Sequence, residues 1–185
     1  MAKQFESIDD RLKNFIERQH IFFTASATDS SRVNISPRER GCLRVLGPNC
    51  VIYLDRTGSG NETAAHLRAD GRLTMMFCAV EGPPMILRLY GHGRAIHHNS
   101  SEYEDIVARY YGGSEPSGAR QIIWLDIDLV QTSCGFGVPL FDYKAERNSL
   151  DTWTEVKGQD GLESYRREKN KYSMDGLPTG MFDDA

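Results

Sequence analysis

Short runs of alternating apolar and polar residues, separated by glycine, proline and other turn residues, occupy most of the chain. This spacing is typical of half-buried β-strands, because successive side chains of a strand point to opposite faces of the sheet. The clearest example is the run in which Ile123, Leu125, Ile127 and Leu129 alternate with more polar neighbours. Strands are predicted at residues 21–28, 33–36, 50–54, 72–80, 85–98 and 120–133.

Apolar residues at helical spacing predict helices near both ends of the chain and between the strands. In residues 7–20, Leu12, Phe15 and Ile16 form one apolar stripe, and Ser7 provides a helix-capping signal. Further helices are predicted at residues 61–70, 101–111, 150–158 and 161–173. Residues 39–49 have only a short apolar stretch among glycine, proline and charged residues, which predicts a loop.

Most links between the predicted strands are too short for parallel crossovers, so the sheet is predicted to be antiparallel. The long strand predicted at residues 85–98 is interrupted by Gly91 and Gly93, and glycines inside a strand often mark a bulge or a barrel corner. The expected fold is mainly β (α+β), an antiparallel six-stranded barrel with flanking helices. One domain is expected over residues 1–185, with an N-terminal helix in 1–20 and a C-terminal helical segment and tail in 142–185.

Composition narrows the function classes. The chain of 185 residues has 22 basic and 26 acidic residues and a net charge of −4, which argues against non-specific nucleic-acid binding. No stretch approaches the length of a membrane span, and the N-terminus has no apolar signal region, so a cytoplasmic protein without membrane partners is expected. The four scattered cysteines are expected to be reduced thiols.

The segment from Asp55 to Thr63 is the leading candidate for binding chemistry, because its two glycines lie between a strand end and a helix start. Backbone N–H groups there could cradle a phosphate at the positive end of the helix. The alternative is a Ser59/Glu62 capping box that satisfies only the helix itself. The residues alone favour the capping box, and the established nucleotide-binding motifs are missing.

Three other segments contain residue types that can serve in binding or catalysis. The glycines around Phe136 allow close backbone approach to a flat ligand, and Cys134 is expected to be a buried or pocket-lining thiol. Histidines 92, 97 and 98 have no carboxylate placed to complete a metal shell, so no metal site is predicted. The basic residues 166, 167, 169 and 171 are interleaved with acidic ones, which predicts a solvated helix face. No catalytic acid or base is identifiable.

Taken together, several motifs resemble one family. They are VNISPR, VIYLDRTGSGNETAAHL, RLTMMFCA, ILRLYGHGR, QTSCGFGVP and EKNKYSMDGLPTG, spread from Phe5 to Gly180. The pattern resembles the pyridoxamine 5′-phosphate oxidase-like family of FMN-binding split barrels. The resemblance implies a six-stranded antiparallel split barrel that forms a homodimer, with FMN at the subunit interface and both subunits contributing to each site.

The resemblance also implies which residues bind the cofactor. The strand with Asn34 and Ser36 would run along the flavin ring, and Arg38 would be a phosphate-binding cation. The segment beginning at Asp55 would hold the ribityl phosphate, and Arg88 would border the cofactor. Donors in that segment would be Thr57, Ser59, Asn61 and Thr63, and the partner subunit would close the pocket with Gly135, Phe136, Gly137 and Val138. Because of this resemblance, the segment from Asp55 to Thr63, called the Gly-rich turn below, is interpreted as a phosphate-binding site rather than as a capping box of the following helix.

Two departures from the family pattern limit the functional prediction. Ser59, Gly60 and Asn61 stand where the authentic oxidase has a basic segment, and its C-terminal Arg-x-His element has no counterpart here. FMN binding is therefore better supported than oxidation of vitamin B6. The leading hypothesis is a homodimeric FMN-dependent oxidoreductase acting on a small organic substrate. The alternatives are a flavin store or redox sensor without turnover, an F420-dependent reductase of the same fold, and haem binding through His92 or His98.

Overall fold

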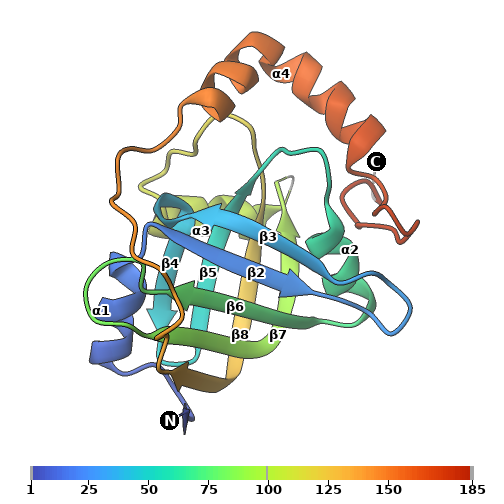
Figure 1. Cartoon of the computed structure of the whole chain (residues 1–185). Helices are drawn as coiled ribbons and strands as arrows, with labels where there is room; N and C mark the ends of the chain where they lie inside the picture. Colours follow the sequence, from blue (N-terminus) through green and yellow to red (C-terminus); the bar gives the residue numbers. More distant parts are fainter. Residues whose placement is uncertain (1, 99, 184–185) are drawn as a thin grey trace.

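The protein is built around one antiparallel sheet that curls into a split barrel (Figure 1). The computed structural model describes residues 2–98 and 100–183. The eight strands follow the order β3-β2-β6-β7-β8-β5-β4, and β1 pairs with β8. They are β1 (Lys3–Phe5), β2 (Ile21–Ser26), β3 (Asn34–Glu39), β4 (Leu43–Gly47), β5 (Cys50–Arg56), β6 (Arg72–Cys78), β7 (Ile86–His97) and β8 (Ala119–Ser133).

The irregularity predicted at the glycines of the strand at residues 85–98 is confirmed in β7. Strand β7 pairs with β6 on one side and with β8 on the other, and the β7–β8 register shifts between Tyr90 and Gly91. A Cβ atom on Gly91 would lie 1.9 Å from the backbone oxygen of Asp126, so this close approach of two strands excludes every side chain. The bend lets the sheet curl around its apolar face.

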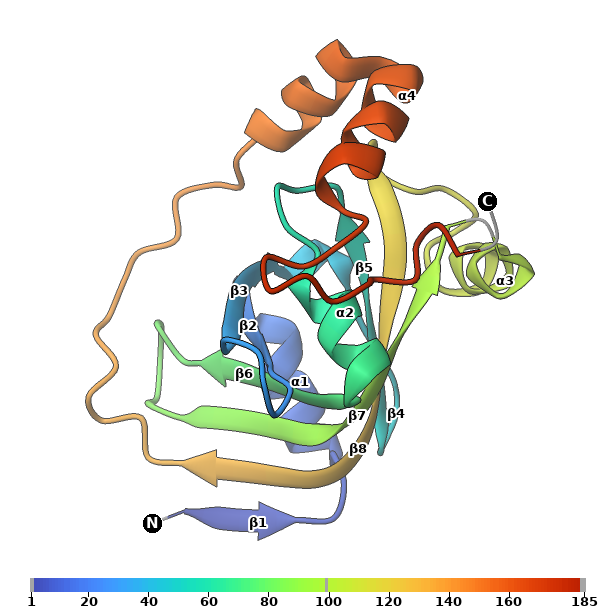
Figure 2. The same cartoon turned by 90° about the vertical axis from the view of Figure 1, so that its right-hand side faces the viewer.

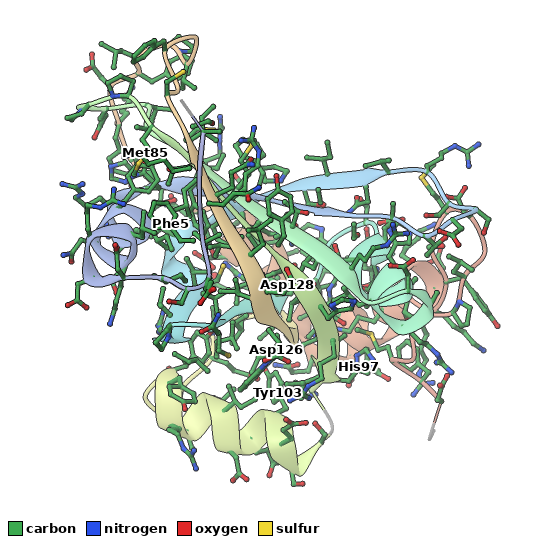
Figure 3. The ribbon with its side chains drawn as sticks, turned by 90° about the horizontal axis from the view of Figure 1, so that it is seen from below. Phe5, Met85, His97, Tyr103, Asp126 and Asp128 are labelled. Atoms are coloured by element: carbon green, nitrogen blue, oxygen red, sulfur yellow. The ribbon has the colours of Figure 1, made fainter. Side chains whose placement is uncertain are left out.

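Four α-helices flank the barrel: α1 (Asp10–Arg18), α2 (Glu62–Ala69), α3 (Ser101–Tyr110) and α4 (Ser149–Lys169). Helix α1 buries the predicted stripe of Leu12, Phe15 and Ile16, but its N-cap is Asp9 rather than Ser7. Figure 3 shows α3 lying across one end of the barrel, with Tyr103 directed toward β7 and β8. The core inside the barrel contains large, fully buried side chains, among them Phe22, Tyr53 and Phe77.

Some predicted elements differ from the structure. Strands β1 and β4 were not predicted, so the sheet has eight strands rather than six. Strand β3 continues past the predicted end at Ser36 to Glu39, through Pro37, because β3 lies at the edge of the sheet beside β2 and an edge strand tolerates a missing N–H group. The prediction of two C-terminal helices is confirmed, because α4 is interrupted at Gly158, whose φ of +65° and ψ of 173° are not helical.

A long connector separates the barrel from its C-terminal helix. Residues 134–148 form neither helix nor strand and lead from the end of β8 around the outside of the barrel to α4 (Figure 2). The chain then returns past α2 and the start of β3. Cys134 at the start of the connector is exposed, so of the two expectations for this thiol, burial was wrong, and a place in the lining of a pocket stays a prediction. Within the described part of the chain, no helix is long and apolar enough to cross a bilayer.

Candidate functional site

A cleft of about 600 Å³ runs along the edge strand β3. Its other walls are the Gly-rich turn before α2 and the segment that follows α4. Of the predicted cofactor residues, the structure brings Asn34, Ser36, Arg38 and Ser59 to this cleft. Four arginines also line it, namely Arg32, Arg38, Arg56 and Arg120.

Strand β3 presents three of these predicted residues at alternate positions. Asn34, Ser36 and Arg38 are half-buried, whereas Ile35 between them is 65% exposed. The side-chain amide of Asn34 donates hydrogen bonds to Ser36 Oγ (3.3 Å) and to Thr63 Oγ1 (3.2 Å) at the start of α2. The cleft wall and the helix N-terminus are therefore tied together by polar side chains.

A buried charge cluster lies beneath the cleft. Asp55, at the end of β5, is 1% exposed and forms ion pairs with Arg38 and Arg120. Arg120 Nε donates to Asp55 Oδ2 over 2.9 Å, and Gln121 Nε2 donates to the same oxygen over 2.8 Å. Burial alone would raise the pKa of Asp55, but the charges of Arg120 and Arg38 outweigh it and hold this pKa below its ordinary value.

This cluster has more positive than negative charge. Two guanidinium groups share one carboxylate, which leaves an excess of one positive charge. Arg120 is 3% exposed, yet its buried Nη1 has no hydrogen-bond partner among the described residues, and neither does the buried Nε of Arg38. Leaving buried charged donors unpaired is costly. The arrangement is therefore suited to an anionic group entering the cleft that both arginines line.

The Gly-rich turn is supported from behind by several buried side chains. Thr57 donates to the backbone oxygen of Gly118 through both its N–H (2.7 Å) and its hydroxyl (2.8 Å). Arg166 Nε of α4 donates to Thr57 Oγ1 over 2.8 Å, and Asn170 Nδ2 donates to the oxygen of Gly58 over 2.9 Å. Arg166 is 7% exposed, so the prediction that it lies on a solvated helix face was wrong.

The capping-box alternative for this turn is not what the structure shows. The N-cap of α2 is Asn61, and its side chain makes no capping hydrogen bond. Asn61 Oδ1 instead accepts from Gln121 Nε2 (2.7 Å), and Asn61 Nδ2 donates to the oxygen of Asn170 (3.4 Å). The first N–H groups of α2 therefore have no side-chain cap, while Ser59 is exposed at the cleft.

The remaining predicted residues lie outside this cleft. Arg88 on β7 pairs with Met76 of β6 and with Gln131 of β8 in the sheet. Its Nη1 donates to Ser133 Oγ over 3.4 Å. Gly135 adopts a φ of +67°, and its Cβ position would lie 2.8 Å from the backbone nitrogen of Met85. Phe136 is 81% exposed. A role for residues 135–138 in a pocket would require a second subunit, as the family resemblance implies.

Sequence reasoning missed much of the cleft. Arg32, Arg56, Arg120, Met174 and Asp175 line it but were not singled out. One local signal existed for Arg120, because a charged residue at the start of the most strongly apolar strand needs a buried partner. The other residues carry no such signal, since their partners lie far away along the chain.

Comparison with solved structures shows that other proteins have the same fold. The HupZ protein of Group A Streptococcus superposes with a TM-score of 0.56 at 17% identity, over 68% of this chain and 99% of that chain. A putative pyridoxamine 5′-phosphate oxidase from Lactobacillus delbrueckii gives a TM-score of 0.52 at 14% identity, over 68% and 94% of the two chains. At such identities the likeness concerns the fold.

Sequence comparison gives the family itself. The pyridoxamine 5′-phosphate oxidase family model matches residues 8–134. The pyridoxamine 5′-phosphate oxidase family protein ustO of Aspergillus flavus is 40% identical over 190 residues, covering 94% of this chain and 76% of that protein. The chain therefore belongs to the pyridoxamine 5′-phosphate oxidase family. The match to the family model ends at residue 134, just after β8, so α4 and the residues after it lie outside that model.

Proposed function

We propose that this protein is an FMN-binding oxidoreductase that acts on a small organic substrate as a homodimer. The observation that carries the proposal is the cluster of Arg38, Arg120 and Asp55, which has an excess of one positive charge and whose two arginines line the cleft. A phosphate monoester carries between about one and two negative charges at neutral pH, which suits such a site. Family membership supports the same proposal.

The residues present fit FMN as follows. The exposed turn at Ser59, beside the uncapped N-terminus of α2, would receive the phosphate. Asn34 and Ser36 on β3 would line the flavin, and the guanidinium groups beneath the cleft would stabilise negative charge. Asp55 is buried and engaged by its cations, so its role is to orient them rather than to touch the cofactor. When bound, FMN supplies hydride and electron transfer at its isoalloxazine ring.

The absorption spectrum and the mass of the cofactor that co-purifies test this proposal. A yellow protein that releases FMN, and whose melting temperature rises when FMN is added, is the expected result. A colourless protein that FMN neither binds nor stabilises would refute it. Bound flavin that neither NAD(P)H nor small substrates reduce would instead indicate a store or sensor. A deazaflavin spectrum would identify F420, and a Soret band would identify haem.

Exposed apolar side chains support the dimer. Val33, just before β3, and Ile35 on β3 are 68% and 65% exposed, and Phe136, Leu140 and Phe141 on the connector are exposed as well. Large apolar side chains that are exposed in one subunit become buried where they lie in a protein interface. A symmetric dimer would bury them and would bring residues 135–138 of the partner to the cofactor, as the resemblance implies.

Replacing Ile35 by lysine is expected to convert the dimer to a monomer and to weaken FMN binding, because a charge would enter the apolar contact. Light scattering during size-exclusion chromatography measures the change. Val156→Lys is the matched control, since Val156 is 84% exposed on α4. A dimer that survives Ile35→Lys unchanged would remove β3 from the interface.

A further inference from the structure

After α4, residues 172–178 form a hairpin whose tip lines the cleft. Tyr172 and Pro178 form an isolated antiparallel bridge, Ser173 N donates to the oxygen of Leu177 (2.9 Å), and Gly176 N donates to the oxygen of Ser173 (2.9 Å). The hairpin is thus closed by its own hydrogen bonds. Its tip residues Met174 and Asp175 are cleft residues, although they lie outside the region matched by the family model.

This hairpin is fastened to both sides of the cleft. The carboxylate of Asp175 accepts from the backbone N–H of Arg32 (2.8 Å) and pairs with the Arg32 guanidinium, just before β3. On the other side, Met174 N donates to Glu62 Oε1 over 3.3 Å at the N-terminus of α2. The tip therefore bridges the start of β3 and the start of α2, and it forms a wall across this end of the cleft.

The charges of this wall differ from those of the cleft floor. Glu62 and Asp175 are the two carboxylates among the residues that line the cleft, and both lie at the hairpin. The pairing of Asp175 with Arg32 also removes one of the four cleft arginines from free contact with a ligand. A phosphate at the Gly-rich turn would lie next to this wall, because Asn170 binds Gly58 at the base of the hairpin.

A terminal phosphate monoester and a phosphate with a second substituent meet this wall differently. A monoester ends at its phosphate and needs no space beyond it. A phosphate that is linked further, by an anhydride bond or a second ester, carries a second substituent and further negative charge past the phosphate, toward Met174, Asp175 and Glu62. Exclusion by occupied space and by like charge is a common source of specificity.

From these contacts, and resting on the proposed FMN function, we infer that the hairpin tip is a specificity element. It restricts the cleft to a flavin whose phosphate is a terminal monoester. It rejects FAD and F420, in which this phosphate carries a second substituent, through an anhydride bond in FAD and through a second ester in F420. The residues that carry this selection are Met174 and Asp175, held in place by Arg32 and Glu62.

Titration of the apoprotein with FMN and with FAD, followed by quenching of flavin fluorescence, tests the inference. The wild type is expected to bind FMN at least about 10-fold more tightly than FAD. In Met174→Gly/Asp175→Ala, FAD binding should tighten by about 10-fold while FMN binding changes by less than about 3-fold. Asp175→Asn, which keeps the size of the side chain, should show a smaller change in the same direction. Asp105→Ala on the exposed face of α3 is the matched control.

The outcomes separate the inference from the proposal on which it rests. If neither flavin binds the wild type, the proposed FMN function fails. If the wild type binds FMN and FAD equally, FMN binding stands and the selection is overturned. A preference for FMN that persists in the hairpin variants would show that another element selects the cofactor. Retained FMN binding in each variant shows that the variant is folded.

Discussion

FMN binding is expected to weaken by between about 10-fold and 100-fold when Arg120 is replaced by methionine. The substitution removes the buried guanidinium whose Nη1 has no hydrogen-bond partner in the described part of the chain, and with it the excess positive charge beneath the cleft. A hydrogen bond to a charged group contributes about 1.5–3 kcal/mol, and each 1.4 kcal/mol is a tenfold change in affinity. Fluorescence or calorimetric titration of the apoprotein with FMN measures the effect.

The fold should survive this substitution, because Asp55 keeps its ion pair with Arg38 and its hydrogen bond from Gln121. Methionine also fills most of the space of the arginine stem. Arg109→Met, at an exposed position on α3, is the control and should bind FMN like the wild type. Equal FMN affinity in a folded Arg120→Met protein would show that the buried cluster does not serve the cofactor.

The largest loss of stability is expected for Asp55→Asn. This change keeps the shape of the side chain but leaves Arg38 and Arg120 buried without their carboxylate. Removing one partner of a buried ion pair typically costs about 3–5 kcal/mol, because the remaining charge is uncompensated. The free energy of unfolding from urea denaturation at pH 7 measures this loss.

A double-mutant cycle tests the cause of that loss. Asp55→Asn/Arg120→Met contains one buried guanidinium instead of two, so it should be more stable than Asp55→Asn alone. If the double variant is less stable by the sum of the two single effects, charge excess does not explain the instability.

The same carboxylate makes stability depend on pH. Because the folded-state pKa of Asp55 is lowered from its ordinary value of 3.8, its stabilising contribution is complete above that value. The contribution is lost as the pH falls through the folded-state pKa, where the unfolded state binds the proton more readily. The wild type should therefore lose stability below pH 3.8 more steeply than Asp55→Asn does.

The sequence was sufficient for the parts of the fold that local patterns encode. The stripe of Leu12, Phe15 and Ile16 predicted α1, and the alternation from Ile123 to Leu129 predicted β8. Strand β4 was missed because its residues are only half-buried except Leu43, so they show no clear alternation. Its place at the edge of the sheet is decided by pairing with β5, which a local pattern does not reveal.

The site was less predictable, because its contacts join distant parts of the chain. The Gly-rich turn and the face of β3 with Asn34 and Ser36 could be recognised from family motifs. Arg32 and Asp175 are 143 positions apart, and nothing near either residue indicates the other. Arg166 looked solvated because the Glu163–Arg167 pair follows a surface pattern, yet Arg166, one position earlier, points to Thr57.

The long connector has a consequence for biosynthesis. A ribosome produces every strand of the barrel before it reaches residue 134, and the supports of the Gly-rich turn, Arg166 and Asn170, follow only later. At typical translation rates this interval lasts about 2–7 s. The nascent chain can close its barrel in that time, but the clamp on the turn and the hairpin wall do not yet exist. If the protein binds FMN as proposed, the fully supported turn is therefore expected to become available only after residue 170 has been made.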